Sequence, residues 1–187
     1  MKRLLIVVDM QNDFVTGALG NKDAVKIIPN VVEKVKEYIE HKDEIVFTRD
    51  THDSFYLETE EGRNLPIPHC IAGRWGWEII DELKPYQDSE DTKIVTILKK
   101  SFGSQGLMTY MCKNLYSSIE VIGLCTDICV LSNTVIAKAA ADDAPVYVDA
   151  ACCAGVTPES HDTALKALKA IHIHIQNEGK EPWRGAV

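Results

Sequence analysis

The chain has 187 residues, of which 45% are hydrophobic and 26% are charged, and its net charge is -8. This composition is typical of a globular protein, and the acidic balance argues against a nucleic-acid partner, since a phosphate backbone attracts basic surfaces. No apolar run is long enough for a secretory or membrane segment, so we expect a single domain over residues 1–187, located in the cytoplasm, with its six cysteines reduced.

Short apolar runs alternate with helical patterns along the chain. Strands are predicted over residues 3–8, 44–48, 93–98, 119–124, 144–150 and 171–175. Helices are predicted over residues 31–41, 126–143 and 157–171, the second with Thr126 or Asp127 near its N-cap. Continuous strands rich in Val and Ile are typical of a parallel sheet covered on both faces. The alternation therefore predicts an α/β fold, a doubly wound three-layer sandwich with a six-stranded, mostly parallel sheet.

One segment does not follow this alternation. Residues 50–76 are rich in Gly and Pro and have little periodicity, and irregular loops of that length in compact domains are usually functional or disordered. In open α/β sheets, ligands bind beyond the carboxyl ends of the strands. Asp9, Asp50 and Lys99 end the first three predicted strands, and the fourth leads into "GLCTDIC". The predicted site is therefore this edge of the sheet.

Cys129 is the candidate nucleophile. It lies in the first turn of a predicted helix, where backbone N–H groups and the macrodipole favour a thiolate. The alternative is packing, since free cysteine is among the most buried residue types. Asp9 would act as a general base toward this thiol, with Lys99 as its cationic partner. Alternatively, Asp9 caps the following turn and Lys99, beside Lys100, is simple surface charge.

The two ends of the long loop offer metal ligands. Asp50 and His52 stand at its start and His69 near its end, and Asp and His with such spacing can ligate a divalent cation. Two loop histidines alone would be weak support for a metal site. A phosphate site is not expected, because "DMQNDF" follows the first strand where a glycine-rich loop would be needed.

With these residues in place, nearly the whole chain resembles the isochorismatase-like cysteine hydrolases, and within them the nicotinamidases. The matching motifs are "DMQNDF" (9–14), "DTH" (50–52), "PHC" (68–70), "KKSFGS" (99–104), "GLCTDICV" (123–130) and "DAACCAGVTPES" (149–160). The resemblance implies a catalytic triad of Asp9, Lys99 and Cys129, a cis peptide before Cys125, and an oxyanion hole formed by the backbone N–H groups of Cys125 and Cys129.

The resemblance also implies a divalent metal, Zn²⁺ by preference with Fe²⁺ or Mn²⁺ as alternatives. Its ligands would be Asp50, His52, His69 and a fourth residue, for which "ETEEGRNLP" offers Glu58, Glu60 and Glu61; we choose Glu61. The implied substrate pocket contains Phe14, Phe102 and Trp75, with Trp77 as the alternative to Trp75. Pro66 stands where nicotinamidases often place an aromatic residue.

The implied activity is hydrolysis of nicotinamide to nicotinate and ammonia, as in pyridine nucleotide salvage, with a small-molecule amide as the partner. The alternatives are a related cysteine hydrolase acting on another small amide or carbamoyl compound, and a catalytically silent metal-binding member of the fold. Neither nucleic acid nor membrane is expected as a partner, and apolar helix faces are compatible with a homo-oligomer.

Overall fold

The computed structural model describes residues 1–87, 92–141 and 143–185. Six parallel strands form one sheet in the order β3-β2-β1-β4-β5-β6. The strands are β1 (Lys2–Val8), β2 (Glu44–Asp50), β3 (Ile94–Lys99), β4 (Tyr116–Leu124), β5 (Val146–Ala154) and β6 (His174–Gln176). The predicted α/β sandwich is confirmed, and all the strand pairs are parallel.

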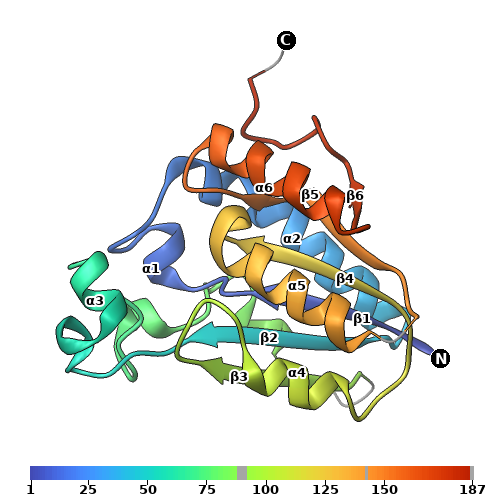
Figure 1. Cartoon of the computed structure of the whole chain (residues 1–187), viewed down its shortest axis with the longest axis horizontal. Helices are drawn as coiled ribbons and strands as arrows, with labels where there is room; N and C mark the ends of the chain where they lie inside the picture. Colours follow the sequence, from blue (N-terminus) through green and yellow to red (C-terminus); the bar gives the residue numbers. More distant parts are fainter. Residues whose placement is uncertain (88–91, 142, 186–187) are drawn as a thin grey trace.

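Helices cover both faces of the sheet (Figure 1). On one face, α2 (Lys22–Glu40) packs through Ile27, Val31 and Val35 against Leu5 and Val7 of β1. On the other face lie α4 (Gln105–Met111), α5 (Leu131–Ala140) and α6 (Pro158–Ala170). Alternate side chains of β1 thus enter two separate apolar layers, because successive residues of a strand point to opposite faces. None of the helices in the described ranges is long and apolar enough to cross a membrane.

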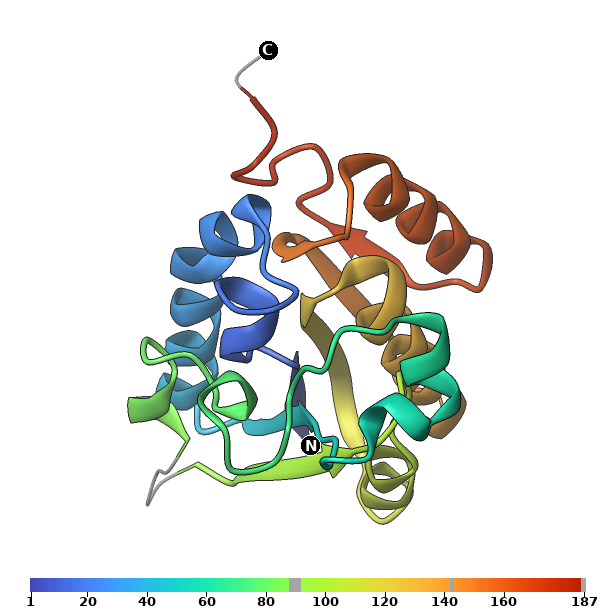
Figure 2. The same cartoon turned by 90° about the vertical axis from the view of Figure 1, so that its left-hand side faces the viewer.

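Short elements gather at the carboxyl ends of the strands, and Figure 2 looks onto this edge of the sheet. They are α1 (Asn12–Val15), η1 (Tyr56–Glu58), α3 (Glu60–Asn64) and η2 (Trp75–Trp77), while η3 (Lys84–Tyr86) lies farther along the chain. The segment 50–76 is therefore an irregular loop with single helical turns.

Several predicted boundaries were wrong. Strand β4 begins at Tyr116 and not at residue 119, and β5 ends at Ala154 and not at residue 150. Helix α2 begins at Lys22 and not at residue 31, because Asn21 caps it by accepting from the N–H groups of Asp23 and Ala24. The last strand begins at His174, because Ile171 and Ile173 still donate their N–H groups to Leu168 O at the end of α6. The predicted helix 126–143 is instead a π-helical turn, η4 (Thr126–Val130), followed by α5.

Neither Thr126 nor Asp127 is the N-cap of that turn. The N-cap position is occupied by Cys125, which makes no side-chain cap hydrogen bond. The hydroxyl of Thr126 contacts His161 Nδ1 instead, and Asp127 Oδ1 accepts from the N–H of Val156. Both side chains therefore tie the turn to the segment that leads into α6.

Candidate active site

A cavity of about 350 Å³ opens at the carboxyl edge of the sheet, where β1, β2, β3 and β4 end. Cys129, Cys125 and three of the four predicted metal ligands line it together with a mainly apolar wall. Its lining residues are Phe14, Leu19, Gly20, Asn21, Asp50, Glu61, Leu65, His69, Phe102, Cys125, Ile128, Cys129 and Val156. The candidate nucleophile and the candidate metal ligands thus face the same space.

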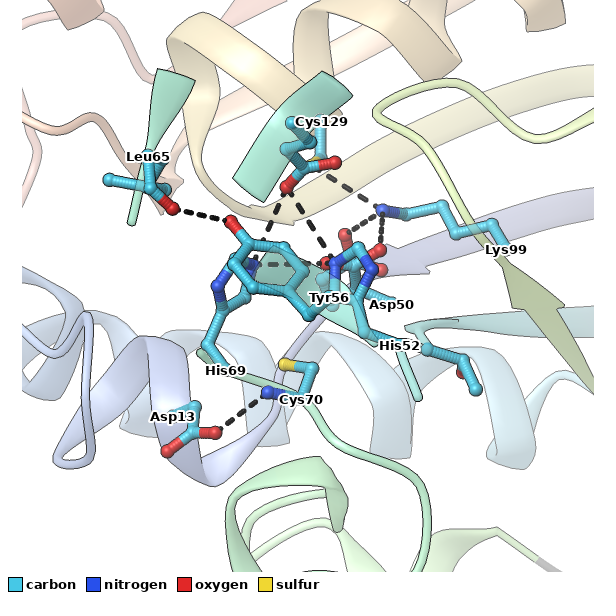
Figure 3. A network of polar contacts seen from close by, with 12 residues as sticks. Asp13, Asp50, His52, Tyr56, Leu65, His69, Cys70, Lys99 and Cys129 are labelled. Atoms are coloured by element: carbon cyan, nitrogen blue, oxygen red, sulfur yellow. Dashed lines mark hydrogen bonds and ion pairs between the residues drawn. The ribbon is translucent and has the colours of Figure 1, made fainter. Parts of the chain in front are cut away.

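Lys99 connects the three residues predicted as a triad. Its Nζ lies 2.6 Å from Asp9 Oδ2 and 3.5 Å from Cys129 Sγ, and all three side chains are buried. The same nitrogen lies 3.2 Å from Asp50 Oδ1 (Figure 3). Folding therefore brings together side chains from the ends of β1 and β3 and from the turn after β4. Lys100, by contrast, is exposed.

Asp9 is held at the end of β1 in a left-handed backbone conformation, with φ of 48°. Its Oδ1 accepts a hydrogen bond of 2.7 Å from the hydroxyl of Thr48 on β2. Its Oδ2 forms the ion pair with Lys99 and has no hydrogen bond of good geometry within the described ranges. One carboxylate oxygen is thus fixed by the neighbouring strand, and the other retains a free lone pair in the site.

Burial controls the protonation of this cluster. Burial raises the pKa of Asp9, and the positive charge of Lys99 only partly offsets this effect. Burial and the charge of Asp9 raise the pKa of Cys129 well above that of a free thiol. Burial alone would lower the pKa of Lys99, but the neighbouring Asp9 and Cys129 hold this pKa above its usual value. Burial beside a carboxylate therefore opposes the preference for a thiolate that the helix start provides.

The turn that carries Cys125 and Cys129, residues 125–130, is the nucleophile turn. The peptide between Leu124 and Cys125 is cis, as expected. The N–H groups of Ile128 and Val130 both donate to Cys125 O, and Asn133 Nδ2 donates to Cys129 O at 2.8 Å. Just before the turn, Gly123 has φ of +116°, and a Cβ there would lie 2.1 Å from Val8 O. Glycine at this position allows β4 to pass directly against the end of β1.

Asp50, His52, Glu61 and His69 form a compact donor set. One donor atom from each lies within 4.8 Å of all the others. His52 Nε2 is 3.0 Å from Asp50 Oδ2, and His69 Nε2 is 3.5 Å from the same oxygen and 3.6 Å from Glu61 Oε1. Two imidazole nitrogens and two carboxylates fit Zn²⁺, Fe²⁺ or Mn²⁺.

The surroundings of the donor set support its fit to a metal ion. His69 Nδ1 is 2.8 Å from Ile67 O, so the N–H lies at Nδ1 and the Nε2 lone pair faces the carboxylates. Tyr56 packs edge-on against both histidine rings (Figure 3). Glu61 is positioned by α3, which begins at its N-cap Thr59. Gly62 is required here, because a Cβ would lie 2.0 Å from Tyr56 O.

Sequence reasoning missed Gln11, which fixes Asp50. Its side-chain amide donates to Asp50 O at 2.9 Å and accepts from the N–H of Asp50 at 2.7 Å. Asp13 was also missed; its carboxylate accepts from the N–H of Cys70 at 2.8 Å and so anchors the chain next to His69. Both residues stand in the motif "DMQNDF", which was the available signal, but their partners are distant in sequence.

Of the predicted pocket aromatics, Phe14 and Phe102 line the cavity, and Trp75 does not. Trp75 is 59% exposed, because η2 turns its side chain to the surface. The alternative, Trp77, also lies outside; its ring stacks under the guanidinium of Arg49 and its indole N–H donates to Thr51. Aliphatic side chains that the sequence did not single out complete the wall, namely Leu19, Leu65, Ile128 and Val156.

Comparisons with known proteins agree with this geometry. A model of the Isochorismatase domain family matches residues 3–177. A Bacillus subtilis (strain 168) protein described as an uncharacterized isochorismatase family protein, PncA, is 33% identical over 143 residues, covering 72% of this chain and 78% of that protein.

Two solved structures are similar over nearly the whole chain. The nicotinamidase/pyrazinamidase PncA from Bacillus subtilis has a TM-score of 0.83 and 29% identity, covering 94% of this chain and 100% of that one. The pyrazinamidase of Pyrococcus horikoshii in complex with zinc has a TM-score of 0.78 and 30% identity, covering 94% and 98%. The similarity therefore extends over the sheet and over the edge where the cavity lies.

Proposed function

Because the chain belongs to the isochorismatase family, we propose that it is an amide hydrolase of the nicotinamidase type, converting nicotinamide to nicotinate and ammonia. The observation that carries the proposal is the contact of Lys99 with both Asp9 and Cys129 beside a cavity that is also lined by three members of the metal donor set. A carboxamide attached to a nitrogen heterocycle has one group for the thiol and one for a metal ion.

In the proposed reaction, the proton of Cys129 passes to Asp9 as Sγ attacks the carboxamide carbon. Asp9 Oδ2, which pairs with Lys99 and retains a free lone pair, can receive this proton, and the raised pKa of Asp9 favours holding it. Lys99 keeps the developing negative charge balanced in a buried site, where an unpaired charge would be costly. The backbone N–H groups of Cys125 and Cys129 are assigned to the carbonyl oxygen as it becomes negative, with each donor worth roughly 3–4 kcal/mol in comparable sites.

The tetrahedral adduct then breaks its C–N bond. Asp9 returns the proton to the departing nitrogen, and ammonia leaves a thioester on Cys129. Water attacks this thioester and gives up a proton to Asp9. The C–S bond then breaks, Asp9 returns this proton to the sulfur, and the product leaves as a carboxylate after its own proton passes to solvent. In each half-reaction the carboxyl group of Asp9 accepts a proton from the nucleophile and returns it to the leaving group, which agrees with a pKa raised by burial.

Asp50, His52, Glu61 and His69 would hold the divalent cation. When bound, it would supply a Lewis-acid contact for a ring nitrogen or for water. The protein itself contributes the apolar wall that orients the ring, with Phe14 on the side of His69, where their ring centroids are 5.5 Å apart. Because an aromatic contact adds about 0.5–1.5 kcal/mol beyond burial, Phe14 would favour a flat heterocycle.

A second candidate is a cysteine hydrolase for another small amide or carbamoyl compound. It is favoured by the aliphatic wall formed by Leu19, Leu65, Ile128 and Val156, and by Pro66 at the position where nicotinamidases often carry an aromatic residue. An aliphatic wall binds an aliphatic substrate as well as a ring, so the two candidates differ in substrate and share the chemistry.

The test is an ammonia-release assay on the zinc-loaded protein with nicotinamide and a panel of aliphatic and carbamoyl amides. Nicotinamide is expected to have the highest kcat/KM.

The variant Cys129→Ala should lose at least about a thousandfold in kcat with an unchanged Tm, because it removes the nucleophile and keeps a small side chain. Cys112→Ala, which alters an exposed thiol outside the cavity, is the matched control. Wild-type rates in Cys129→Ala would refute the nucleophile assignment, and a preference for an aliphatic amide would favour the second candidate.

A further inference from the structure

A second buried polar network lies on the far side of the nucleophile turn. Thr126 Oγ1 is 2.8 Å from His161 Nδ1, and His161 Nε2 is 3.3 Å from Glu181 Oε1. Thr126, His161 and Glu181 are all buried, and none of them lines the cavity. The mechanism above uses none of these groups, and burying polar groups is costly unless each finds a partner. The network therefore needs its own explanation.

The segment 177–185, which follows β6, closes this network (Figure 1, red chain beyond β6). Trp183 donates its indole N–H to Cys153 O at 3.0 Å and packs its ring edge-on against His161, with centroids 4.9 Å apart. Arg184 forms ion pairs with Glu181 and with Asp162 on α6. These contacts place the carboxylate of Glu181 over the imidazole of His161 from the side opposite the nucleophile turn.

The partners of the imidazole define which of its nitrogens carries a proton. Burial lowers the pKa of His161 against the opposing effect of Glu181, so the ring is neutral. Glu181 can only accept while ionised, which assigns the N–H to Nε2. Nδ1 is then an acceptor, and the hydroxyl of Thr126 donates to it. The Thr126 side chain thereby has one fixed rotamer, directed away from the cavity.

We propose that His161 is a positioning residue for the hydrolysis, because it holds Thr126 and with it the nucleophile turn. Thr126 lies between Cys125 and Cys129, whose N–H groups are assigned to the oxyanion. The peptide that joins Cys125 to Thr126 carries Cys125 O, which accepts from the N–H groups of Ile128 and Val130 on either side of Cys129, so fixing the Thr126 side chain helps to hold the turn that aims both donors. The contact of Asp127 with the N–H of Val156 tethers the same turn to the same segment. This inference rests on the proposed function, since it needs an oxyanion to be stabilised.

Two pairs of variants separate positioning from simple structural support. In His161→Asn, the amide oxygen occupies the place of Nδ1 and can still accept from Thr126, but the contact with Glu181 is lost. In His161→Gln, the amide nitrogen reaches the place of Nε2 and can still donate to Glu181, but the contact with Thr126 is lost. Thr126→Ser keeps the hydroxyl, and Thr126→Val removes it at nearly constant volume.

The expected result is a fall in kcat of about tenfold for His161→Gln and Thr126→Val, with KM unchanged, because a contact that aims oxyanion donors matters in the transition state and not in substrate binding. His161→Asn and Thr126→Ser should retain kcat per folded active site to within about twofold, even if their Tm values fall. A purely structural network would lower the Tm of the two histidine variants alike and leave kcat per folded site unchanged in all four, which would overturn the proposal. If the histidine variants do not fold, the two threonine variants decide.

Failure of the proposed function can be told apart from failure of this inference. If the wild type releases no ammonia from any amide, the proposed function fails, and 3-pyridinecarboxaldehyde becomes the probe. Its carbonyl carbon would form a bond to Cys129 Sγ, the thiol proton would pass to Asp9, and the carbonyl oxygen would become the oxyanion of the adduct. A dissociation constant of the adduct about tenfold higher in Thr126→Val than in Thr126→Ser would support the positioning role. Equal affinities, or no adduct with the wild type, would overturn it.

Discussion

Replacing Thr48 by valine should shift the acid limb of the pH–rate profile to higher pH. The hydroxyl of Thr48 donates to Asp9 Oδ1 at 2.7 Å in a fully buried environment. A hydrogen bond to the ionised form lowers the pKa of a carboxyl group, and this contact opposes the effect of burial on the pKa of Asp9. Removing the hydroxyl therefore raises the pKa of Asp9 further, and the carboxyl remains protonated to higher pH.

The size of the effect follows from the charge on the acceptor. Hydrogen bonds to charged groups contribute about 1.5–3 kcal/mol, which corresponds to a decrease of roughly ten- to a hundredfold in the ionised fraction of Asp9 at a fixed pH on the acid limb. Because Asp9 must be ionised to accept the thiol proton, kcat/KM should fall by the same factor there. At pH values above the limb, the variant should recover the wild-type rate, since valine fills the same space in β2.

The assay is kcat/KM for ammonia release as a function of pH on zinc-loaded protein, using the amide that the wild type hydrolyses best. The rate of alkylation of Cys129 by iodoacetamide, measured over the same range, reports on the same cluster without a substrate. Thr48→Ser keeps the hydroxyl and should match the wild type in both measurements. A Thr48→Val profile that overlies the wild-type profile, or one lowered equally at every pH, would refute the assignment of Asp9 as the base.

Three further predictions concern the metal, the pocket and stability. Glu61→Gln should weaken Zn²⁺ binding by at least about tenfold in a chelator competition, while Glu60→Gln, on the same helix outside the donor set, should match the wild type; equal affinities would remove Glu61 from the ligands. Phe14→Ala should raise KM for a heterocyclic amide, and Trp75→Ala should leave KM unchanged because Trp75 lies outside the cavity. A raised KM in Trp75→Ala with an unchanged KM in Phe14→Ala would contradict this assignment of the substrate pocket. Burial raises the pKa of the Cys152 and Cys153 thiols in the folded chain, so only the unfolded chain ionises them above about pH 8.5. The free energy of unfolding should then fall with rising pH, by about 1.4 kcal/mol per pH unit for each thiol, and Cys153→Ala should reduce this slope in urea titrations.

The sheet was predictable because its strands are continuous apolar runs whose burial on both faces leaves a strong signal. The edge where the site lies was predictable for the same reason, since polar residues such as Asp9 and Lys99 interrupt those runs at the strand ends. Asp50, His52 and His69 were candidate metal ligands from their residue types and spacing, and Glu61 was added from the resemblance to a family; the fold brings the four donor atoms together. Their roles remain predictions until the variants are measured.

What the sequence could not reveal depends on tertiary contacts. The exposure of Trp75 is decided by the direction of the single turn η2, which has no periodicity to read. The start of α2 was missed because Pro29 lies inside the helix, where proline usually marks a boundary. The raised pKa of Cys129 was missed because local position at a helix start favours a thiolate, whereas burial beside Asp9 has the larger effect. Only for Cys129 did a long-range contact outweigh a local preference.

Gly123 has a consequence for how this chain can vary. Its Cα lies against the carbonyl of Val8, the residue before Asp9, so that a single methyl group at position 123 would push apart the two strands that bring the base and the nucleophile together. The left-handed backbone at this position independently disfavours every side chain. Sequence drift in related proteins that keep this chemistry should therefore leave position 123 untouched, even though its residue never meets the substrate.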